Sequence, residues 1–126
     1  MNNPVVWFEL YVEDMPRARA FYETMLGITL ESLKMPDSQD DLEMWAFPMD
    51  MTRTGAGGAL AKMAGVAPGG GGTLVYFACE DCAVEARRAV DAGGSLLKPK
   101  MAIGEYGFIA IVQDTEGNCI GLHSMH

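Results

Sequence analysis

The stretch of sequence that decides the fold is residues 5–27, VVWFELYVEDMPRARAFYETMLG. Its first part, residues 5–12, is rich in β-branched and aromatic side chains, which favour a β-strand. Asp14 and Pro16 then stand where the N-cap and first turn of a helix prefer them, and apolar residues follow at helical spacing as far as Gly27. The stretch therefore predicts a strand that runs directly into a helix.

The predicted helix carries its apolar side chains on one side. They recur at the spacing of a single helix face and comprise Ala18, Phe21, Tyr22, Met25 and Leu26. We therefore expect one buried helix face.

Shorter strands are predicted in the rest of the first half, at residues 28–35, 42–48 and 58–63. An acidic loop containing Asp37, Asp40 and Asp41 separates the first two, and a glycine-containing turn at residues 55–58 precedes the third. Residues 65–72, GVAPGGGG, have the composition of a flexible linker.

The pattern then starts again. Residues 73–79 have the composition of a strand, Asp81 is a candidate N-cap, and a helix follows that ends at Gly93 and Gly94. Its apolar face comprises Cys82, Ala86, Ala89 and Val90. Further strands are predicted at residues 95–97, 107–113 and 118–124, with a turn at residues 114–117 between the last two.

The two halves form an internal repeat. At an offset of 67 residues, Asp14 falls on Asp81 and Gly27 falls on Gly94. Each half has the order strand, helix, strand, strand, strand, which predicts two βαβββ modules. We expect one domain, with module one at residues 1–64, a linker at 65–72 and module two at 73–126.

Length and charge exclude several classes of protein. The chain has 126 residues, 9 Lys and Arg, 17 Asp and Glu, and a net charge of -8. A chain of this length buries roughly two-thirds of its unfolded surface, enough for one core. Nucleic acids and anionic membranes attract basic surfaces, so neither is an expected partner.

The location is expected to be cytoplasmic. No apolar run approaches the roughly 20 residues that span a bilayer, and the N-terminus lacks the basic region of a secretory signal. Cys79, Cys82 and Cys119 make an odd number of cysteines, which favours reduced thiols.

Motifs along the whole chain resemble those of a known superfamily. They lie at residues 8–22, 26–27, 92–94, 98–100, 107–108 and 114–122. In combination the sequence resembles the glyoxalase/bleomycin-resistance/extradiol-dioxygenase group, the vicinal oxygen chelate superfamily, and within it small uncharacterised proteins related to lactoylglutathione lyase. One departure is Thr115, where the turn usually has proline.

The resemblance implies an α+β fold in which two βαβββ modules form a curved eight-stranded mixed sheet. The helices would lie on the outer face, the concave face would hold a ligand, and the protein would be a homodimer. In the metalloenzymes of the superfamily, one residue from each of four strands holds a divalent metal.

The residues at those ligand positions do not suit a metal. Counting from the turn motifs of the family places Trp7, Leu74 and Gly121 at three of the positions, and the fourth falls in residues 59–61, Ala-Leu-Ala. Zinc and similar cations take imidazole, thiolate, carboxylate or water ligands. We therefore expect no metal and no cofactor.

Strand parity predicts which side chains replace the metal site. Val6, Phe8, Leu10 and Val12 form an apolar face that should pack under the helix, which turns the alternate residues of the strand toward the cavity. With their counterparts in module two and one further aromatic residue, the predicted ligand-binding residues are Trp7, Glu9, Tyr11, Trp45, Leu74, Tyr76, Gly121 and His123.

Glu9 is the candidate catalytic residue or ligand anchor. A carboxylate beside Trp7 and Tyr11 in a partly dry cavity is expected to have a raised pKa, which suits a general base. The alternative is a Glu9 at a wet cavity mouth, or bonded to a neighbouring strand, with no chemical role. His123 could join Glu9 in a displaced metal site, although its place near the C-terminus favours a solvated surface histidine.

Two other motifs are assigned structural roles. Cys79 and Cys82 form a Cys-x-x-Cys motif, but both fall on core-facing positions, so a redox site is not expected. Lys98 and Lys100 around Pro99 suit a solvated strand edge more than an anion site.

The sequence thus favours a protein that sequesters a small aromatic or amphipathic molecule without the usual divalent metal. The alternative is a glyoxalase-like lyase, isomerase or dioxygenase that uses Glu9 as base or a relocated metal at Glu9 and His123. A third possibility is a dimeric interaction module whose pocket is filled by side chains.

Overall fold

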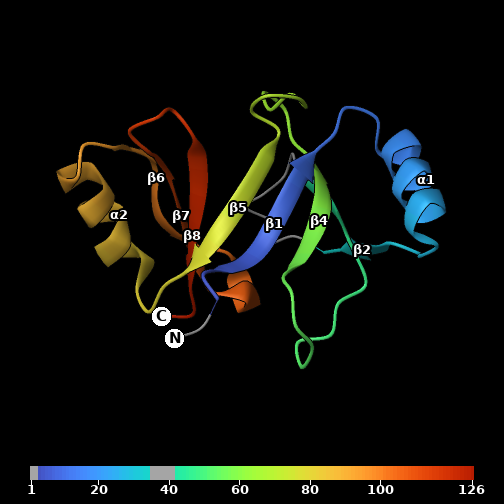
Figure 1. The fold of residues 1–126 in the computed structure, drawn as a ribbon, viewed down its shortest axis with the longest axis horizontal. Coiled ribbons are helices and arrows are strands. Elements are labelled where there is room, and N and C mark those ends of the chain that lie inside the picture. The colour runs from blue at the N-terminus through green and yellow to red at the C-terminus, as the bar shows by residue number, and fades with distance from the viewer. Residues whose placement is uncertain (1–2, 35–41) are drawn as a thin grey trace. The chain divides into compact units, whose positions relative to one another are not determined.

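The computed structural model describes residues 3–34 and 42–126 (Figure 1). The predicted acidic loop from Asp37 to Asp41 lies outside the described residues. The described part divides into two compact units, one of residues 7–73 and one that joins the residues up to Val6 to Leu74–His126. No helix in these described ranges is long and apolar enough to cross a membrane.

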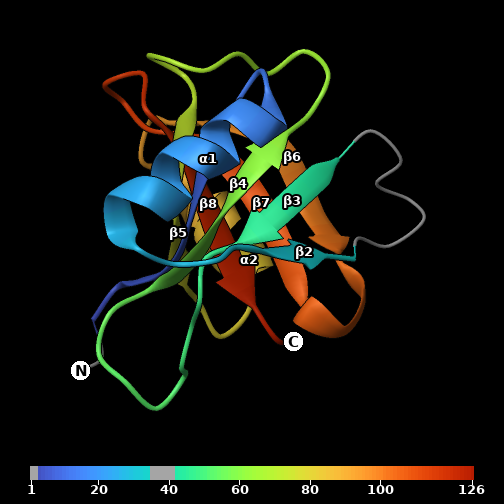
Figure 2. The same cartoon turned by 90° about the vertical axis from the view of Figure 1, so that its right-hand side faces the viewer.

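The described part of the first unit contains one helix and four strands, of which β1 begins two residues before the unit does. Its elements are β1 (Val5–Tyr11), α1 (Met15–Leu26), β2 (Glu31–Leu33), β3 (Glu43–Ala46) and β4 (Gly57–Lys62). The strand order is β2-β3-β4-β1, with β1 parallel to β4 and the other neighbours antiparallel. Figure 2 shows α1 lying across β4, which agrees with the contacts between these two elements.

The second unit repeats this arrangement. Its elements are β5 (Thr73–Ala78), α2 (Cys82–Asp91), β6 (Ser95–Ala102), the short 3-10 helix η2 (Gly104–Tyr106), β7 (Phe108–Gln113) and β8 (Cys119–Ser124). The strand order is β5-β8-β7-β6, and the first strand again pairs in parallel with the last. The predicted α+β fold of two βαβββ modules, with eight strands in a mixed sheet, is confirmed.

The N-terminal residues pair with the second half of the chain. The backbone N–H of Ala78 donates to the carbonyl of Pro4 at 2.9 Å. The residues up to Val6 therefore belong to the second compact unit, whereas the sequence predicts them in module one.

Helix α1 begins and ends as the sequence predicts, because Asp14 accepts a hydrogen bond from Arg17 N and Gly27 takes a left-handed conformation. Its predicted buried face is wrong in part. Ala18 and Tyr22 pack in the core, but Phe21, Met25 and Leu26 are more than half exposed. The ring of Phe21 contacts that of Tyr22 edge-on, with centroids 5.0 Å apart, and Met25 and Leu26 are the last two residues of the helix.

Helix α2 packs on its own strands more completely. Cys82 and Ala86 are buried in a cluster with Ala110, Val112 and Leu122. The N–H of Cys82 donates to the hydroxyl of Ser124 at 3.0 Å, which ties the start of α2 to the end of β8. Cys79 packs against the same cluster, so the predicted core position of Cys79 and Cys82 is confirmed.

Two predicted boundaries are wrong. Strand β6 continues through Pro99 to Ala102 instead of stopping at residue 97, because it is an edge strand whose outer side needs no N–H donor. Strand β4 begins at Gly57 and ends at Lys62, one residue before each end of the strand predicted at residues 58–63. A side chain at Gly58 would meet the ring of Phe8 at 2.4 Å, so the glycine makes room for that ring.

The glycine-rich segment at residues 65–72 is packed against β1. The N–H of Tyr11 donates to the carbonyl of Gly72 at 2.6 Å, and the N–H of Gly72 donates to the carbonyl of Gly69 at 2.9 Å. The segment therefore has a defined turn beside the end of β1.

Candidate functional site

Three side chains on one face of β1 form a hydrogen-bonded group. Trp7 Nε1 donates to Glu9 Oε2 at 3.0 Å, and the Tyr11 hydroxyl donates to Glu9 Oε1 at 2.8 Å. Glu9 is only 7% exposed, and it is more buried than either aromatic neighbour. The predicted shared orientation of these three residues is therefore seen in the first unit.

The surroundings of this group are small and apolar. Trp7 and Tyr11 pack against a cluster of Met44, Ala59 and Ala61, and Ala59 is the register partner of Glu9 on β4. Gly57 lies beside Trp7, where an added side chain would approach the indole at 3.4 Å. Glu9 thus lies beside small apolar side chains and between the two hydrogen-bond donors Trp7 and Tyr11.

The environment of Tyr11 keeps its hydroxyl protonated. Burial is the main cause that raises the pKa of Tyr11, and the negative charge of Glu9 and its hydrogen bond to Tyr11 raise it further. Tyr11 therefore remains a hydrogen-bond donor to the carboxylate across the physiological pH range.

Trp45 does not join this group. It lies on the helix side of the sheet in a cluster with Leu30 and Leu60, and the guanidinium of Arg19 stands 3.6 Å from its ring centroid. Its position in β3 places it on the opposite face from Met44. The expectation that Trp45 lines the ligand surface with Trp7 is therefore wrong.

In the second unit, an aromatic ring lies on the glycine of the last strand. Tyr76 and Gly121 are register partners, and a Cβ at Gly121 would fall within 3 Å of three carbons of the Tyr76 ring. Tyr76 is 5% exposed, and Leu74 is half-buried on the same strand. Ile120 and Leu122 do not belong to this face, since both pack on the α2 side.

The imidazole of His123 contacts the backbone of the 3-10 helix. Its Nε2 lies 2.6 Å from the carbonyl oxygen of Tyr106, and because a carbonyl only accepts, this nitrogen carries the proton. Nε2 therefore presents no lone pair to a metal, and in the neutral tautomer the lone pair lies on Nδ1.

The family's divalent metal does not fit the residues present. The indole nitrogen of Trp7 is a donor engaged with Glu9, the methyl group of Ala59 is fully buried, and Gly121 has no side chain and is covered by the ring of Tyr76. Within the described ranges, no three His, Cys, Asp or Glu side chains come together as a metal-binding group.

The Cys-x-x-Cys motif has the character of core packing. Burial first, and then the charge of Glu85, raises the pKa of the Cys79 thiol to about 12. Cys82 is fully buried. A thiol that stays protonated at neutral pH is a poor nucleophile, in agreement with the structural role expected for both cysteines.

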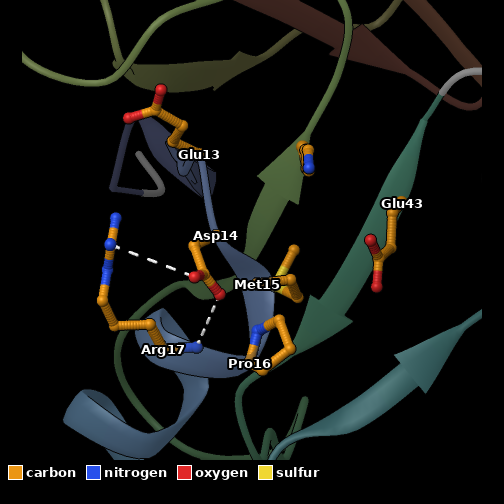
Figure 3. Close-up of a pocket in the computed structure, with 7 residues that line it drawn as sticks. Glu13, Asp14, Met15, Pro16, Arg17 and Glu43 are labelled. Atoms are coloured by element: carbon orange, nitrogen blue, oxygen red, sulfur yellow. Dashed lines mark hydrogen bonds and ion pairs between the residues drawn. The ribbon is translucent and has the colours of Figure 1, made fainter.

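Two hollows lie at the start of α1, and Glu9 lines neither. One, of about 490 Å³, is lined by charged and apolar residues of the β1–α1 corner and of β3 and β4: Glu13, Asp14, Met15, Pro16, Arg17, Glu43 and Lys62. Figure 3 shows Glu13 and Arg17 on one side of Asp14 and Glu43 on the other. The second hollow, of about 370 Å³, lies between α1 and the glycine-rich segment.

Sequence reasoning assigned Glu13 and Arg17 no part in a site, although both line the two hollows. Their position after a strand and in the first turn of a helix was a signal for a corner exposed to solvent. The composition of the glycine-rich segment does not predict that the segment packs beside this corner.

The sequence matches the family model for the Glyoxalase/Bleomycin resistance protein/Dioxygenase superfamily over residues 5–122. Among curated proteins, it is 29% identical over 114 residues to CFP32, named as a candidate glyoxylase, of Mycobacterium bovis and of Mycobacterium tuberculosis. The match covers 90% of this chain and 41% of the relative, so the chain spans less than half the length of these proteins.

Solved structures share the fold at low sequence identity. A methylmalonyl-CoA epimerase variant of Streptomyces coelicolor, in complex with 2-nitronate-propionyl-CoA, has a TM-score of 0.68 and 15% identity over 98% of this chain and 95% of its own. The methylmalonyl-CoA epimerase of Mycobacterium tuberculosis has a TM-score of 0.65 and 17% identity, over 98% of this chain and 88% of its own. A hypothetical protein from Bacillus halodurans has a TM-score of 0.71 and 12% identity, over 98% of this chain and 95% of its own.

Proposed function

Because the chain belongs to the glyoxalase/bleomycin resistance protein/dioxygenase superfamily, we propose that it binds a small aromatic or amphipathic molecule without a resident divalent metal. The binding surface is the face of β1 that carries Trp7, Glu9 and Tyr11, with Glu9 as the polar anchor. In the second module, Tyr76, Gly121 and His123 are proposed as that module's own ligand-binding residues.

The observation that carries this proposal is the burial of Glu9. Placing a carboxylate among Met44, Ala59 and Ala61 costs free energy that an apolar side chain in its place would save. The two hydrogen bonds from Trp7 and Tyr11 fix the orientation of both carboxylate oxygens. A buried and oriented carboxylate between two aromatic rings is typical of a ligand-binding or catalytic site.

The metal-free part of the proposal rests on the side chains at the family's ligand positions. An indole, a leucine side chain, a glycine and a stretch of alanine and leucine provide none of the imidazole or carboxylate groups that divalent metals take. The ligand would therefore be held by aromatic contact and by hydrogen bonds to Glu9.

A single-tryptophan titration tests the proposal. The chain has two tryptophans, so Trp45→Phe leaves Trp7 as the only indole. We expect methylmalonyl-CoA, or a member of a panel of aromatic and amphipathic small molecules, to change Trp7 fluorescence saturably. The matched variant Trp7→Phe reports from Trp45 on the opposite face and should stay unchanged. If no compound changes the Trp7 signal, or if both reporters respond alike, the proposed surface is wrong.

The second candidate function is an enzyme in which Glu9 acts as general base. It is favoured by the fixed orientation of the Glu9 carboxylate and by the fold shared with methylmalonyl-CoA epimerases. A base at Glu9 would exchange the acidic proton of a bound thioester with solvent deuterium. Proton NMR of methylmalonyl-CoA in deuterated buffer measures this exchange. Enzymatic exchange that disappears in Glu9→Gln while binding persists would favour the enzyme over the sequestering protein.

The proposal also includes a homodimer located in the cytoplasm. Light scattering coupled to gel filtration measures the mass in solution, and a monomer at micromolar concentration would remove the dimer from the account.

A further inference from the structure

The hollow between α1 and the glycine-rich segment is lined by Tyr11 but not by Trp7 or Glu9. Its walls come from the end of β1, the first two turns of α1 and the turn at residues 68–73. Its volume of about 370 Å³ lies within the range of small-molecule sites. All of its lining residues belong to the first unit, so its geometry depends on that unit alone.

The inner wall of this hollow is apolar. Leu10, Val12, Ala18 and Tyr22 line it and belong to the helix-side core of the first unit. Pro68 lines the facing side. A ligand seated here would place an apolar body of modest size between Tyr22 and the glycine-rich turn.

The turn requires glycine at two positions, and the backbone N–H and carbonyl of Gly72 are both hydrogen-bonded. Gly69 needs its left-handed conformation, and Gly72 has no room for a side chain because a Cβ would lie 2.8 Å from Pro68 Cα. At Gly70 and Gly71 a Cβ would meet nothing within 4 Å, so crowding does not explain glycine there. Gly70 and Gly71 do not line the hollow, whereas Gly69 and Gly72 do, and the missing side chains of these two let a ligand come close to the turn.

The charged rim favours a cation. Asp14 caps α1 and lies 3.9 Å from Arg17, so these two charges largely offset each other. Glu13 also lines the hollow, and no ion pair joins it to another described residue. The net charge of -8 adds to the attraction for a positive group.

From this geometry we infer that the hollow is a second binding site, which takes a small organic amine. The apolar body of the amine would contact Tyr22 and the glycine-rich turn, and its ammonium group would meet Glu13 at the rim. This site shares Tyr11 with the surface of the proposed function but contains neither Trp7 nor Glu9.

The test uses three probes with a similar body and different charge: phenethylamine, the neutral 2-phenylethanol and the anionic 3-phenylpropionate. Each is titrated into nitrogen-15-labelled full-length protein and followed by the amide signals of Val12, Gly69 and Gly72. We expect saturable shifts with phenethylamine, weaker binding of the alcohol and the weakest binding of the carboxylate.

Variants at Glu13 sharpen the test. Glu13→Gln should weaken phenethylamine binding about threefold, as expected for loss of one exposed charge contact. Glu13→Lys should reverse the preference toward 3-phenylpropionate. The control Glu80→Gln changes the residue that the internal repeat places opposite Glu13, and it should leave binding unchanged.

The inference is overturned if phenethylamine shifts none of the three amides, or if the amine and the carboxylate bind equally well. It is also overturned if the amine shifts the Trp7 indole signal and leaves the glycines in place, because the amine then binds at the Glu9 face. An equal loss of affinity in Glu13→Gln and Glu80→Gln would show attraction by overall charge instead of by this site.

Discussion

At Gly121, only a hydrogen atom fits between the backbone and the ring of Tyr76. A Cβ would come within 2.2 Å of Tyr76 Cδ1, which is far inside van der Waals contact. The same relation occurs at Gly58, where the ring of Phe8 takes the space of the missing side chain. In both cases the residue type at one strand position is decided by a ring on the parallel neighbour.

Gly121→Ala should therefore destabilise the protein by about 1–3 kcal/mol, the usual cost of overpacking. Denaturant unfolding measures the change. In a Tyr76→Ala background the ring is gone, and the same Gly121→Ala substitution should cost much less. An equal cost in both backgrounds would show that the ring does not set the requirement for glycine.

The thiol of Cys79 predicts a dependence of stability on alkaline pH. Its pKa is raised from 9.0 to about 12, chiefly by burial, so the folded state favours the protonated thiol. The contribution of the protonated thiol to the free energy of unfolding is complete below pH 9 and is lost as the pH rises from 9 toward 12. The difference in unfolding free energy between the wild type and Cys79→Ala should shrink over this window.

The control for this prediction is Cys119→Ala, since Cys119 is exposed and its thiol already meets solvent. The assigned burial is contradicted if the difference in unfolding free energy between the wild type and Cys79→Ala stays constant from pH 8 to the onset of alkaline unfolding.

At the scale of elements, the start of α2 depends on a residue from the far end of the chain. The buried hydroxyl of Ser124 accepts a hydrogen bond from Cys82 N and donates to the carbonyl of His126. Ser124→Ala leaves a buried N–H without this acceptor and should cost about 1–3 kcal/mol. The exposed strand residue Ser95 provides the control Ser95→Ala, and equal thermal denaturation of the two variants would refute the role of Ser124.

The elements show which features a sequence can predict. The caps at Asp14 and Asp81 and the turn at Asp114 follow from local chemistry, because each carboxylate bonds N–H groups two to four residues away. The exposure of Phe21 and Met25 was not predictable, since periodicity gives the direction of a helix face but not the width of what it packs against.

At the scale of the whole molecule, the N-terminal residues stabilise the second unit. Pro4 accepts a hydrogen bond from Ala78 N, at the end of β5. Removing residues 1–4 should therefore speed hydrogen exchange at Ala78 relative to a control that begins at Asn3. Equal exchange at Ala78 in both proteins would mean that this pairing does not protect β5.

The candidate site was predictable only in part. Alternation along β1 placed Trp7, Glu9 and Tyr11 on one face, and the structure adds the hydrogen bonds that join them. Trp45 was assigned to the wrong face because the register of β3 depends on its pairing with β4, which the sequence of β3 does not contain. The hollow beside the glycine-rich segment arises from the folding of that segment onto β1, a long-range contact without a local signal.

The central claim is that the face around Glu9 works without a divalent metal. The most direct measurement is metal content per chain by mass spectrometry, on untagged protein incubated with nickel, zinc, manganese and iron(II) and then desalted. The account predicts a value near zero for every metal. A value near one ion per chain for any of them would contradict it and would favour metal-dependent chemistry, with Glu9 and His123 as the first ligands to substitute.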